Sequence, residues 1–468
     1  MIRVPARLKP WMALPATVVM ALVPLLFLTA SAQGCGQPAA ALASDDATST
    51  QQISIPQESD WLDYGAVIPS GPAGAWDDGL GMAPPMSTIV RKDGSFFFYY
   101  VGFDGIRASD EGERNRTVGV ATSRDGIRFA KHEGNPIITY RPNNNEEEAA
   151  GGVAATVDAE GNIVMYWGAA DAGSPTSTSV DSDIRLSTSS DGLTFTDQGD
   201  IISHLNPAVW GYGDELFPLG VYQYGESWHL YYIAKGLFGI DWDVGLASGP
   251  APDQLTQTRC ALAKGSGSNY FGGGSIVALG PDTYAIFLVR NNGAPFVEVR
   301  TFSPQTPHLL SAPVAVYSVP NLREATVFLD HERKTWFMYA LDSSTSTNYF
   351  EWHIHLKLAP AGPPDTTPPG APTQLAAVSG EPDGIALSWG AAEDADTGVV
   401  VYNIYRDGEK LGSTFDLAYR DNSEAASPTA AYEVSAVNLH GVEGARSGPV
   451  RVVPPPVEPH CYLPYLAM

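Results

Sequence analysis

The chain has 468 residues, with 47 glycines, 37 prolines, 10% aromatic residues and only 17% charged residues. This length predicts two or three domains, and the composition is typical of turn-rich β structure rather than of helical bundles. The formal net charge of −25 disfavours nucleic acid or anionic lipid as a partner, because a polyanion would be repelled.

Residues 1–32 have the pattern of a secretory signal peptide. Basic residues precede an apolar run at 11–28, and Ala30-Ser31-Ala32 is a small-residue cleavage site. The alternative, a membrane-spanning anchor, is disfavoured by Pro15 and Pro24 within the run. We therefore expect export to the extracellular space or the cell surface.

Residues 33–59 are expected to form a flexible tether, because they are rich in Ala, Ser, Thr and Gln and lack a core-forming pattern. Cys35 follows Ala32-Gln33-Gly34, a poor match to a bacterial lipoprotein box. Despite this poor match, lipid attachment to the cell envelope through Cys35 is kept as an alternative to free secretion. The other cysteines are Cys260 and Cys461, and three cysteines predict no disulfide framework.

An internal repeat occupies residues 60–360 and decides the expected fold. Tyr100, Tyr166 and Tyr232 recur 66 positions apart within aromatic strands. Each aromatic strand follows a polar turn typical of tight hairpins, and a shorter apolar strand precedes that turn. The five aromatic strands are expected at 96–102, 163–168, 228–233, 284–289 and 336–341.

Four short strands in each of five repeats predict an all-β fold, a five-bladed β-propeller. Residues 61–68 have the pattern of an outer strand without a blade of its own. We expect this segment to complete the fifth blade and to close the ring, which removes free sheet edges. A β-sandwich is the alternative fold, disfavoured by the five similar aromatic strands.

The remainder of the chain divides into a linker, a small domain and a tail. Residues 361–372 are proline-rich and are expected to be stiff and extended. Residues 373–453 alternate with period two and resemble a fibronectin type III domain, an immunoglobulin-like β-sandwich, with Trp389 and Tyr432 in its core. The resemblance implies a spacer without a catalytic role. Residues 454–468 resemble short hydrophobic tails of secreted bacterial proteins, or are a frayed end.

Acids at the starts of the first strands are the candidates for chemistry. In a propeller these strands start around one central cavity, so acids far apart in sequence lie close together. Such an arrangement suits glycoside hydrolysis, which needs two carboxyl groups across the scissile bond. Blade one offers Trp76-Asp77-Asp78, and blade three offers Asp214-Glu215.

With these residues, the region resembles the five-bladed hydrolase superfamily that includes glycoside hydrolase families 32, 43 and 68. The resemblance implies that Asp77, with Asp78 as the alternate, is the nucleophile or general base beside Trp76. It implies that Glu215, upstream of Pro218, is the general acid. The residues alone leave ordinary alternatives open: a capped turn at Asp77 and a solvated acidic turn at Glu215.

To act as a general acid, Glu215 must hold a proton near neutral pH. Desolvation by Trp210 and Tyr212, together with repulsion from Asp214, would raise its pKa. Trp210, Tyr212, Trp242 and Phe271 are also candidates for stacking on sugar rings, against the more ordinary role of blade packing.

The other three blades depart from the family or add to it. In blade two the family places an Asp, where this sequence has alanines after Glu148; Glu148 is a candidate substrate contact or part of a solvated loop. This departure puts substrate binding, and activity itself, in question. In blade five, Arg323 would hold a sugar hydroxyl or carboxylate, or pair with Glu324. In blade four, Gly272–Gly274 leaves no side chain at the rim and is expected to widen the cavity.

No metal site and no cofactor are expected. Glu351, His353 and His355 share a strand face at metal-like spacing, but no further kind of ligand is clustered with them. The sequence also contains no glycine-rich phosphate loop and no serine nucleophile elbow.

These observations predict a secreted or surface-tethered glycoside hydrolase that acts on a polysaccharide or oligosaccharide through two carboxylates. The alternative is a non-catalytic carbohydrate-binding or adhesion protein on the same scaffold. A glycoside phosphorylase would need a basic phosphate pocket, which 27 Lys and Arg residues among 468 disfavour. The sugar, the linkage, the stereochemistry and the oligomeric state are left open.

Overall fold

The computed structural model describes residues 53–80, 87–103, 116–139, 148–170, 182–211, 215–235, 241–263, 270–291, 294–319, 321–343, 352–379, 384–423 and 426–452. Within these ranges every regular element is a β-strand, apart from a 3-10 turn (η1) at Glu58–Asp60. The predicted all-β class is therefore confirmed. The same ranges contain no helix of the length and hydropathy needed to span a membrane.

Residues 62–360 form five antiparallel sheets, numbered here by the order of their first strands. Sheet 1 contains β2 (Gly79–Leu80), β3 (Ser87–Lys92), β4 (Ser95–Phe103), β5 (Arg116–Ser123) and β6 (Ala130–Lys131). Sheet 2 contains β7 (Glu148–Val157), β8 (Ile163–Ala170), β9 (Ser182–Ser189) and β10 (Thr196–Ile202). Sheet 3 contains β11 (Glu215–Tyr224), β12 (Ser227–Lys235), β13 (Asp241–Gly249) and β14 (Gln257–Leu262).

The last two sheets complete the set. Sheet 4 contains β15 (Tyr270–Ala278), β16 (Tyr284–Asn291), β17 (Pro295–Phe302) and β18 (Ala315–Ser318). Sheet 5 contains β19 (Leu322–Asp330), β20 (Thr335–Asp342), β21 (His353–Pro360) and β1 (Leu62–Ile68). Sheets 2 and 3 are joined by one parallel pair, Glu215 with Ser182.

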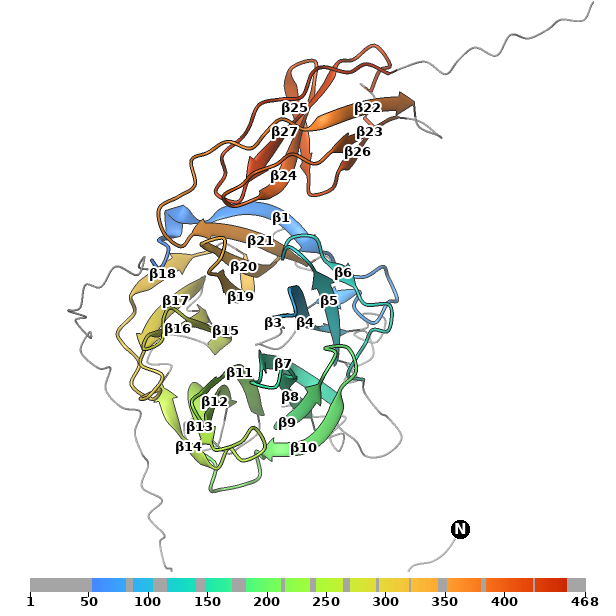
Figure 1. Ribbon diagram of the computed structural model, residues 1–468. Helices are drawn as coiled ribbons and strands as arrows, with labels where there is room; N and C mark the ends of the chain where they lie inside the picture. The colour runs from blue at the N-terminus through green and yellow to red at the C-terminus, as the bar shows by residue number, and fades with distance from the viewer. Residues whose placement is uncertain are drawn as a thin grey trace, which may run out of the picture. The chain divides into compact units, whose positions relative to one another are not determined.

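The five sheets form a closed ring. The first strands β3, β7, β11, β15 and β19 contact one another in that order, and β19 in turn contacts β3 (Figure 1). In each sheet the first strand lies nearest the centre of the ring, and the later strands lie farther out (Figure 1).

The chain closes the ring with its own N-terminal strand. β1 pairs antiparallel with β21, from Leu62 opposite Leu358 to Ile68 opposite Ile354. The prediction that residues 61–68 complete the last sheet is therefore confirmed. The described end of the expected tether, from residue 53 on, is not flexible but held against the ring: the backbone N–H of Ser54 donates to the carbonyl of Ala361 beside sheet 5 at 3.0 Å, and the hydroxyl of Tyr317 on sheet 4 donates to the carbonyl of Pro56 at 2.8 Å.

A buried tyrosine ties each sheet to the next. In four of the five sheets, the fifth residue after the polar turn donates its hydroxyl to a carbonyl in the turn between the third and fourth strands of the next sheet. The pairs are Tyr99 with Gly192 (2.9 Å), Tyr166 with Pro252 (2.7 Å), Tyr231 with Pro307 (2.5 Å) and Tyr339 with Gly126 (2.8 Å).

These hydrogen bonds show which tyrosines occupy equivalent positions in the sheets, and they explain why sheet 4 has no such tyrosine. The equivalent positions are Tyr99, Tyr166 and Tyr231, so the even spacing through Tyr100 and Tyr232 paired non-equivalent residues. Sheet 4 has Phe287 at this position. Its neighbour is sheet 5, where β21 and β1 are joined by the ring closure and no turn exists to supply the carbonyl.

Residues 373–438 form a small two-layer sandwich. One layer contains β22 (Thr373–Ser379), β23 (Ile385–Gly390) and β26 (Ala418–Asp421), and the other contains β24 (Val399–Arg406), β25 (Glu409–Thr414) and β27 (Tyr432–Asn438). Trp389 and Tyr432 are buried in its core. The sandwich also contacts the ring: His440 lies 3.1 Å from the hydroxyl of Thr335, and Arg128 donates to the carbonyl of Phe415 at 2.6 Å.

Cys260 on β14 is buried and disulfide-bonded. The cysteine count, which predicted no disulfide framework, therefore missed one bond. The count could not exclude this bond, because three cysteines can form one disulfide and leave one thiol free. The partner lies outside the described residues.

Candidate functional site

Glu324 lies where three sheets of the ring meet. Its side chain is 3% exposed, and one carboxylate oxygen accepts the backbone N–H of Ser87 at 2.9 Å. The hydroxyls of Ser87 and Thr326 lie 2.7 Å apart and strengthen the same junction. On the other side, a Cβ at Gly273 would lie 2.7 Å from the Glu324 Cγ. Glu324 on sheet 5 thus contacts the starts of the first strands of sheets 1 and 4; we call this the entry end of the ring.

The glycines of β15 do not widen the cavity as expected. The space above Gly273 is filled by Glu324, and a Cβ at Gly274 would lie 2.6 Å from a methyl group of Leu219 on β11. Glycine is required at position 273 for a second reason, because its φ of +147° is one that other residues rarely adopt. These glycines accept side chains from neighbouring sheets rather than leave open space.

Asp77 is buried beside sheet 1 and fully engaged at one oxygen. Its Oδ2 accepts the hydroxyl of Tyr100 at 3.0 Å and the ammonium of Lys131 at 2.6 Å. The Asp77 side chain is only 4% exposed. Burial, together with the neighbouring Asp77 carboxylate, raises the pKa of Tyr100 well above its usual value, so the phenol stays a donor.

The neighbours of Asp77 fix the loop that carries it. Trp76 packs on Tyr100 with ring centroids 5.4 Å apart and covers Gly102 and Gly119, where a Cβ would clash with the indole. Asp78 is 6% exposed and accepts the backbone N–H of Gly74 at 2.8 Å. Asp78 therefore has the turn-capping contact that the ordinary alternative predicted for this loop.

A small cavity of about 10 Å³ lies beside Glu324. Tyr100, Ser87 and Glu324 all line it, between sheets 1 and 5. Tyr100 donates to Asp77 from the same position. Tyr100 therefore contacts Asp77 and also lines the cavity that Glu324 lines, whereas Asp77 itself does not line that cavity.

The candidates of sheets 2 and 3 are placed by their backbone. Glu215 is the first residue of β11 and pairs with Lys235, and Glu148 is the first residue of β7 and pairs with Ala170. Both acids thus lie at the start of the first strand of their sheet. Ser87 is likewise the first residue of β3, and Glu324 lies near the start of β19. The side chains of Glu215 and Glu148, like all of Tyr212 and Asp214, lie outside the described residues.

Two aromatic candidates of sheet 3 are half-buried and differ in their contacts. Trp210 packs edge-on against Tyr232, whose hydroxyl donates to the Trp210 carbonyl at 2.7 Å. Trp242 stacks on Phe217 with ring centroids 6.2 Å apart and planes 10° apart. Its φ of +60° lies in the left-handed region that bulky residues avoid, and such strain is concentrated at functional sites.

Arg323 points away from the acid beside it. Its Nε donates to the hydroxyl of Ser343 at 3.2 Å, and its guanidinium lies 5.0 Å above the ring of Trp352. Glu324 turns inward to Ser87 instead. Arg323 is exposed, so its planar donors face the solvent at the entry end.

The histidines of β21 lie in a network at the ring closure. His353 accepts the backbone N–H of Ser70 at 3.2 Å, whereas Glu351 lies outside the described residues. His355 stands 3.5 Å from Asp63 and 4.0 Å from Asp342, with Lys357 also bound to Asp63. The expectation that no further kind of ligand lies beside these histidines is therefore wrong: Asp63, Asp342 and His355 have ligand atoms within 4.8 Å of one another, with the Lys357 ammonium also beside Asp63.

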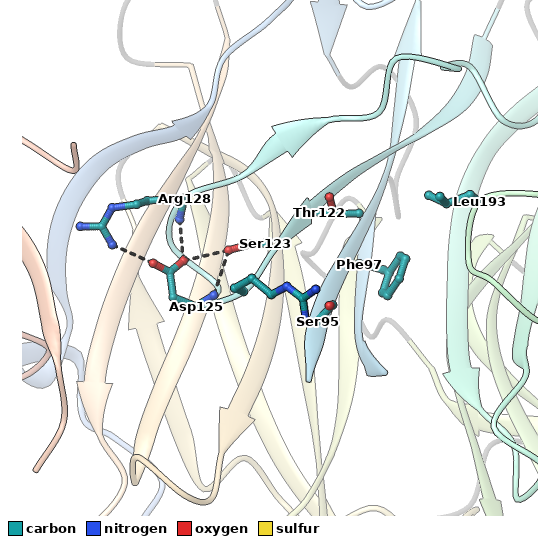
Figure 2. Close-up of a pocket in the computed structure, with 8 residues that line it drawn as sticks. Ser95, Phe97, Thr122, Ser123, Asp125, Arg128 and Leu193 are labelled. Atoms are coloured by element: carbon teal, nitrogen blue, oxygen red, sulfur yellow. Dashed lines mark hydrogen bonds and ion pairs between the residues drawn. The ribbon is translucent and has the colours of Figure 1, made fainter. Parts of the chain in front are cut away.

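A second pocket lies at the opposite end of the ring, between sheets 1 and 2 (Figure 2). It measures about 500 Å³ and is lined in part by Phe97, Arg124, Asp125 and Leu193. Asp125 accepts the backbone N–H groups of Ile127 and Arg128 at 2.8 Å and pairs with the Arg128 guanidinium at 2.7 Å. Because these contacts of Asp125 hold the turn after β5 in place, we do not propose this pocket as a catalytic site.

Lys131 and Tyr100 are the site residues that sequence reasoning missed. Tyr100 appeared only as one of the repeated aromatics, and Lys131 lies in a short outer strand, 54 positions from Asp77. The only available signal was a lysine in a protein with few cations, which does not identify its partner.

Sequence comparison matches known proteins over short segments only, whereas structural comparison matches known folds over about two thirds of the chain. No protein-family model matches the chain. Exoglucanase B of Cellulomonas fimi is 34% identical over 90 residues, 19% of this chain and 8% of that protein. Alpha-amylase of Niallia circulans is 37% identical over 78 residues, 17% and 6% respectively. The chain thus spans less than a tenth of the length of either relative.

Among solved structures, the protein BT0996, solved as a complex with RGII, is similar with a TM-score of 0.50 and 12% identity, over 67% of this chain and 93% of that protein. A family 117 glycoside hydrolase of Zobellia galactanivorans is similar over 65% of this chain and 92% of its own, with 15% identity and a TM-score of 0.47. The first likeness shows a shared fold, and the second is too weak to support an inference.

Proposed function

We propose that the protein is an exported glycoside hydrolase, built as a five-bladed β-propeller with a C-terminal fibronectin type III domain. One observation carries the proposal: in the closed ring, the starts of β11 and β19, which bear Glu215 and Glu324, lie around one centre with only sheet 4 between them. Hydrolysis of a glycosidic bond needs two carboxyl groups held apart across the substrate, and a ring of strand starts supplies them from separate sheets.

In this proposal Glu215 is the general acid and Asp77 is the base or nucleophile, with Asp78 as its alternate. Oδ2 of Asp77 is engaged by Lys131 and Tyr100, and a Cβ at Gly71 would lie 2.2 Å from Oδ1, so the loop at Gly71 must move for a substrate to reach this carboxylate. Glu324 is therefore the second candidate for the base, because it contacts three sheets at the entry end. Trp76, Trp242 and Arg323 are proposed to bind the sugar.

The export of the protein is supported by two features. Residues 1–32 have the signal pattern, and Cys260 is oxidised. Disulfides persist in exported proteins and are rare in the cytosol of ordinary bacteria. We therefore propose an extracellular or cell-surface location.

The experiment is an assay of released reducing sugar on a panel of arabinans, xylans, fructans and mannans. Wild type is compared with Glu215→Gln, Asp77→Asn and Glu324→Gln. Glu226→Gln is the matched control, because Glu226 is exposed in the turn at the other end of the β11–β12 hairpin. We expect Glu215→Gln to lose at least 1,000-fold in rate, a loss typical of removing an acid–base group, while Glu226→Gln keeps the wild-type rate.

A carbohydrate-binding protein without chemistry is the second candidate. It is favoured by β7, where Val153, Ala154 and Ala155 offer no acid in the region where the hydrolase families place one. In that case wild type and Glu215→Gln would bind the same glycan with equal affinity, and neither would release sugar.

A further inference from the structure

We propose that Asp63, Asp342 and His355 form a binding site for one divalent transition-metal ion of the zinc class, at the seam where β1 closes the ring. The three side chains come from the adjacent strands β1, β20 and β21 of sheet 5. One ligand atom of each residue lies within 4.8 Å of the ligand atoms of the other two. An imidazole nitrogen together with two carboxylate oxygens is a donor set that zinc accepts.

The register of sheet 5 brings the two acids to the same face as His355. Asp342 on β20 pairs with His353, which precedes His355 by two positions. Asp63 on β1 pairs with Lys357, which follows His355 by two positions. Because side chains two positions apart on a strand share a face, the acids flank the imidazole diagonally, one from each neighbouring strand.

The distances between the ligand atoms fit a single small ion. His355 Nδ1 lies 3.5 Å from Asp63 Oδ1 and 4.0 Å from Asp342 Oδ2. Two ligands of a tetrahedral zinc ion, each roughly 2.1 Å from the metal, lie about 3.4 Å apart, so both separations are within about 0.6 Å of that geometry. A water molecule would complete the fourth position, as it does at open zinc sites.

The imidazole of His355 is placed to accept an ion. Its Nδ1 is buried and has no hydrogen-bond partner among the described residues, because 3.5 Å to Asp63 exceeds an ordinary hydrogen bond. A buried polar atom without a partner is costly, and a metal ion at this position would satisfy it. The backbone N–H of Gly65 donates to Asp63 Oδ1 at 2.9 Å, which positions the carboxylate and leaves this oxygen a second lone pair for the ion.

Lys357 sets the strength of the site. Its ammonium donates to Oδ2 of Asp63 and repels a second cation beside it. The ammonium and the two carboxylates leave one net negative charge to attract the ion, so we expect moderate affinity that rises when the ammonium is removed.

The proposed ion would hold the strand that closes the ring. Its ligands would join β1 to β21 and, beyond β21, to β20. Since none of the three ligands lies on a first strand, we assign the ion a structural role, and the proposal does not depend on hydrolytic activity.

The test is zinc binding by the full exported chain, purified without a polyhistidine tag and treated with EDTA to remove bound metal. We expect calorimetry to give one Zn²⁺ per chain. The Tm should rise by about 5 °C when the free zinc concentration is about 100 times the dissociation constant. Ca²⁺ at the same concentration should leave the Tm unchanged, because a hard cation prefers oxygen ligands to imidazole.

Substitutions locate the ion. His355→Gln and Asp63→Asn should each weaken zinc binding by about 10-fold or more, whereas Lys357→Met should strengthen it by about 3-fold or more. His331→Gln is the matched control, because His331 is exposed in the turn that precedes β20. This control should bind zinc as wild type does.

Three results would overturn the proposal. Zinc binding that His355→Gln leaves undiminished would show an adventitious ion only. A wild-type Tm that does not respond to excess zinc, or that responds equally to calcium, would exclude a site with an imidazole ligand. Should the ligand variants fail to fold, Lys357→Met decides the question, since zinc binding no tighter than that of wild type would also contradict the site.

Discussion

The carboxylates near the entry end are each held by donors from another part of the protein. Asp77 depends on Lys131 and Tyr100, and Glu324 on the backbone of Ser87. A buried carboxylate keeps its position and charge only while its partners stay in place, because an unpaired buried charge is costly. At this scale the partners of the acids are as open to test as the acids.

Replacing Lys131 by Met should destabilise the protein. Removal of the ammonium leaves the Asp77 carboxylate buried and partly unpaired, at a cost of about 3 kcal/mol. The double substitution Lys131→Met with Asp77→Asn should recover part of that loss, since neither charge remains. Urea unfolding of the four proteins of the cycle measures both effects. Equal stability of wild type and Lys131→Met would show that the pair contributes nothing.

Gly273→Ala should displace Glu324 and reduce any hydrolytic rate. The new Cβ would lie 2.7 Å from the Glu324 Cγ, at a φ of +147°, and such backbone strain costs about 1–3 kcal/mol. Gly280→Ala is the control, because nothing lies within 4 Å of a Cβ there. The unfolding free energy and sugar release should both fall for the first variant and stay unchanged for the second; unchanged rates for both would exclude Glu324 from the site.

At the scale of elements, each sheet depends on its neighbour through the tyrosine ties. The four hydroxyls donate to backbone carbonyls in the turns of the neighbouring sheets. Replacing any one of these tyrosines by phenylalanine removes the donor, and the loss of a buried hydrogen bond is the expected effect.

The ties give a matched pair of substitutions. Tyr166→Phe should lose about 1–2 kcal/mol of unfolding free energy, because the Pro252 carbonyl loses its donor. Phe287→Tyr should also destabilise, since this buried position faces the ring closure and has no turn carbonyl to receive the new hydroxyl. Chemical unfolding measures both. If Phe287→Tyr were as stable as wild type, the explanation of the exception in sheet 4 would fail.

His229 on β12 should make stability depend on pH. Burial lowers its pKa to about 4. Between about pH 4 and pH 6.5, His229 is therefore neutral in the folded protein but protonated in the unfolded protein, where its pKa is about 6.5. Its contribution is complete above pH 6.5 and is lost as the pH falls toward 4, with a slope of up to about 1.4 kcal/mol per pH unit. His229→Asn should remove that slope from the difference between pH 7 and pH 4.5. Parallel pH profiles of the two proteins would contradict the assignment.

At the scale of the whole molecule, the sequence was informative wherever a pattern repeats. Aromatic strands after polar turns predicted the sheets, and the lone strand at 61–68 predicted the closure with β21. Repetition made these predictions possible, because each sheet must bury the same two faces. The alternation of 373–453 likewise predicted strands with Trp389 and Tyr432 inside.

What the sequence could not predict depends on contacts between sheets. The filling of the space at Gly273 by Glu324, the Lys131 contact of Asp77 and the shifted register of the tyrosines each join residues from different repeats or distant strands. A single sequence without relatives aligned to it carries no trace of such pairs. The oxidised Cys260 belongs to the same class.

In the proposed function, Glu215 donates a proton to the leaving group at the entry end of the ring. The most direct measurement compares wild type with Glu215→Gln on two glycosides of the sugar that the polysaccharide panel identifies. One glycoside has an alkyl leaving group that needs protonation, and the other has a dinitrophenyl group that does not. We expect a loss of at least 1,000-fold in kcat/KM on the first and less than about 10-fold on the second. Equal losses on both substrates, or no loss on either, would contradict this role of Glu215.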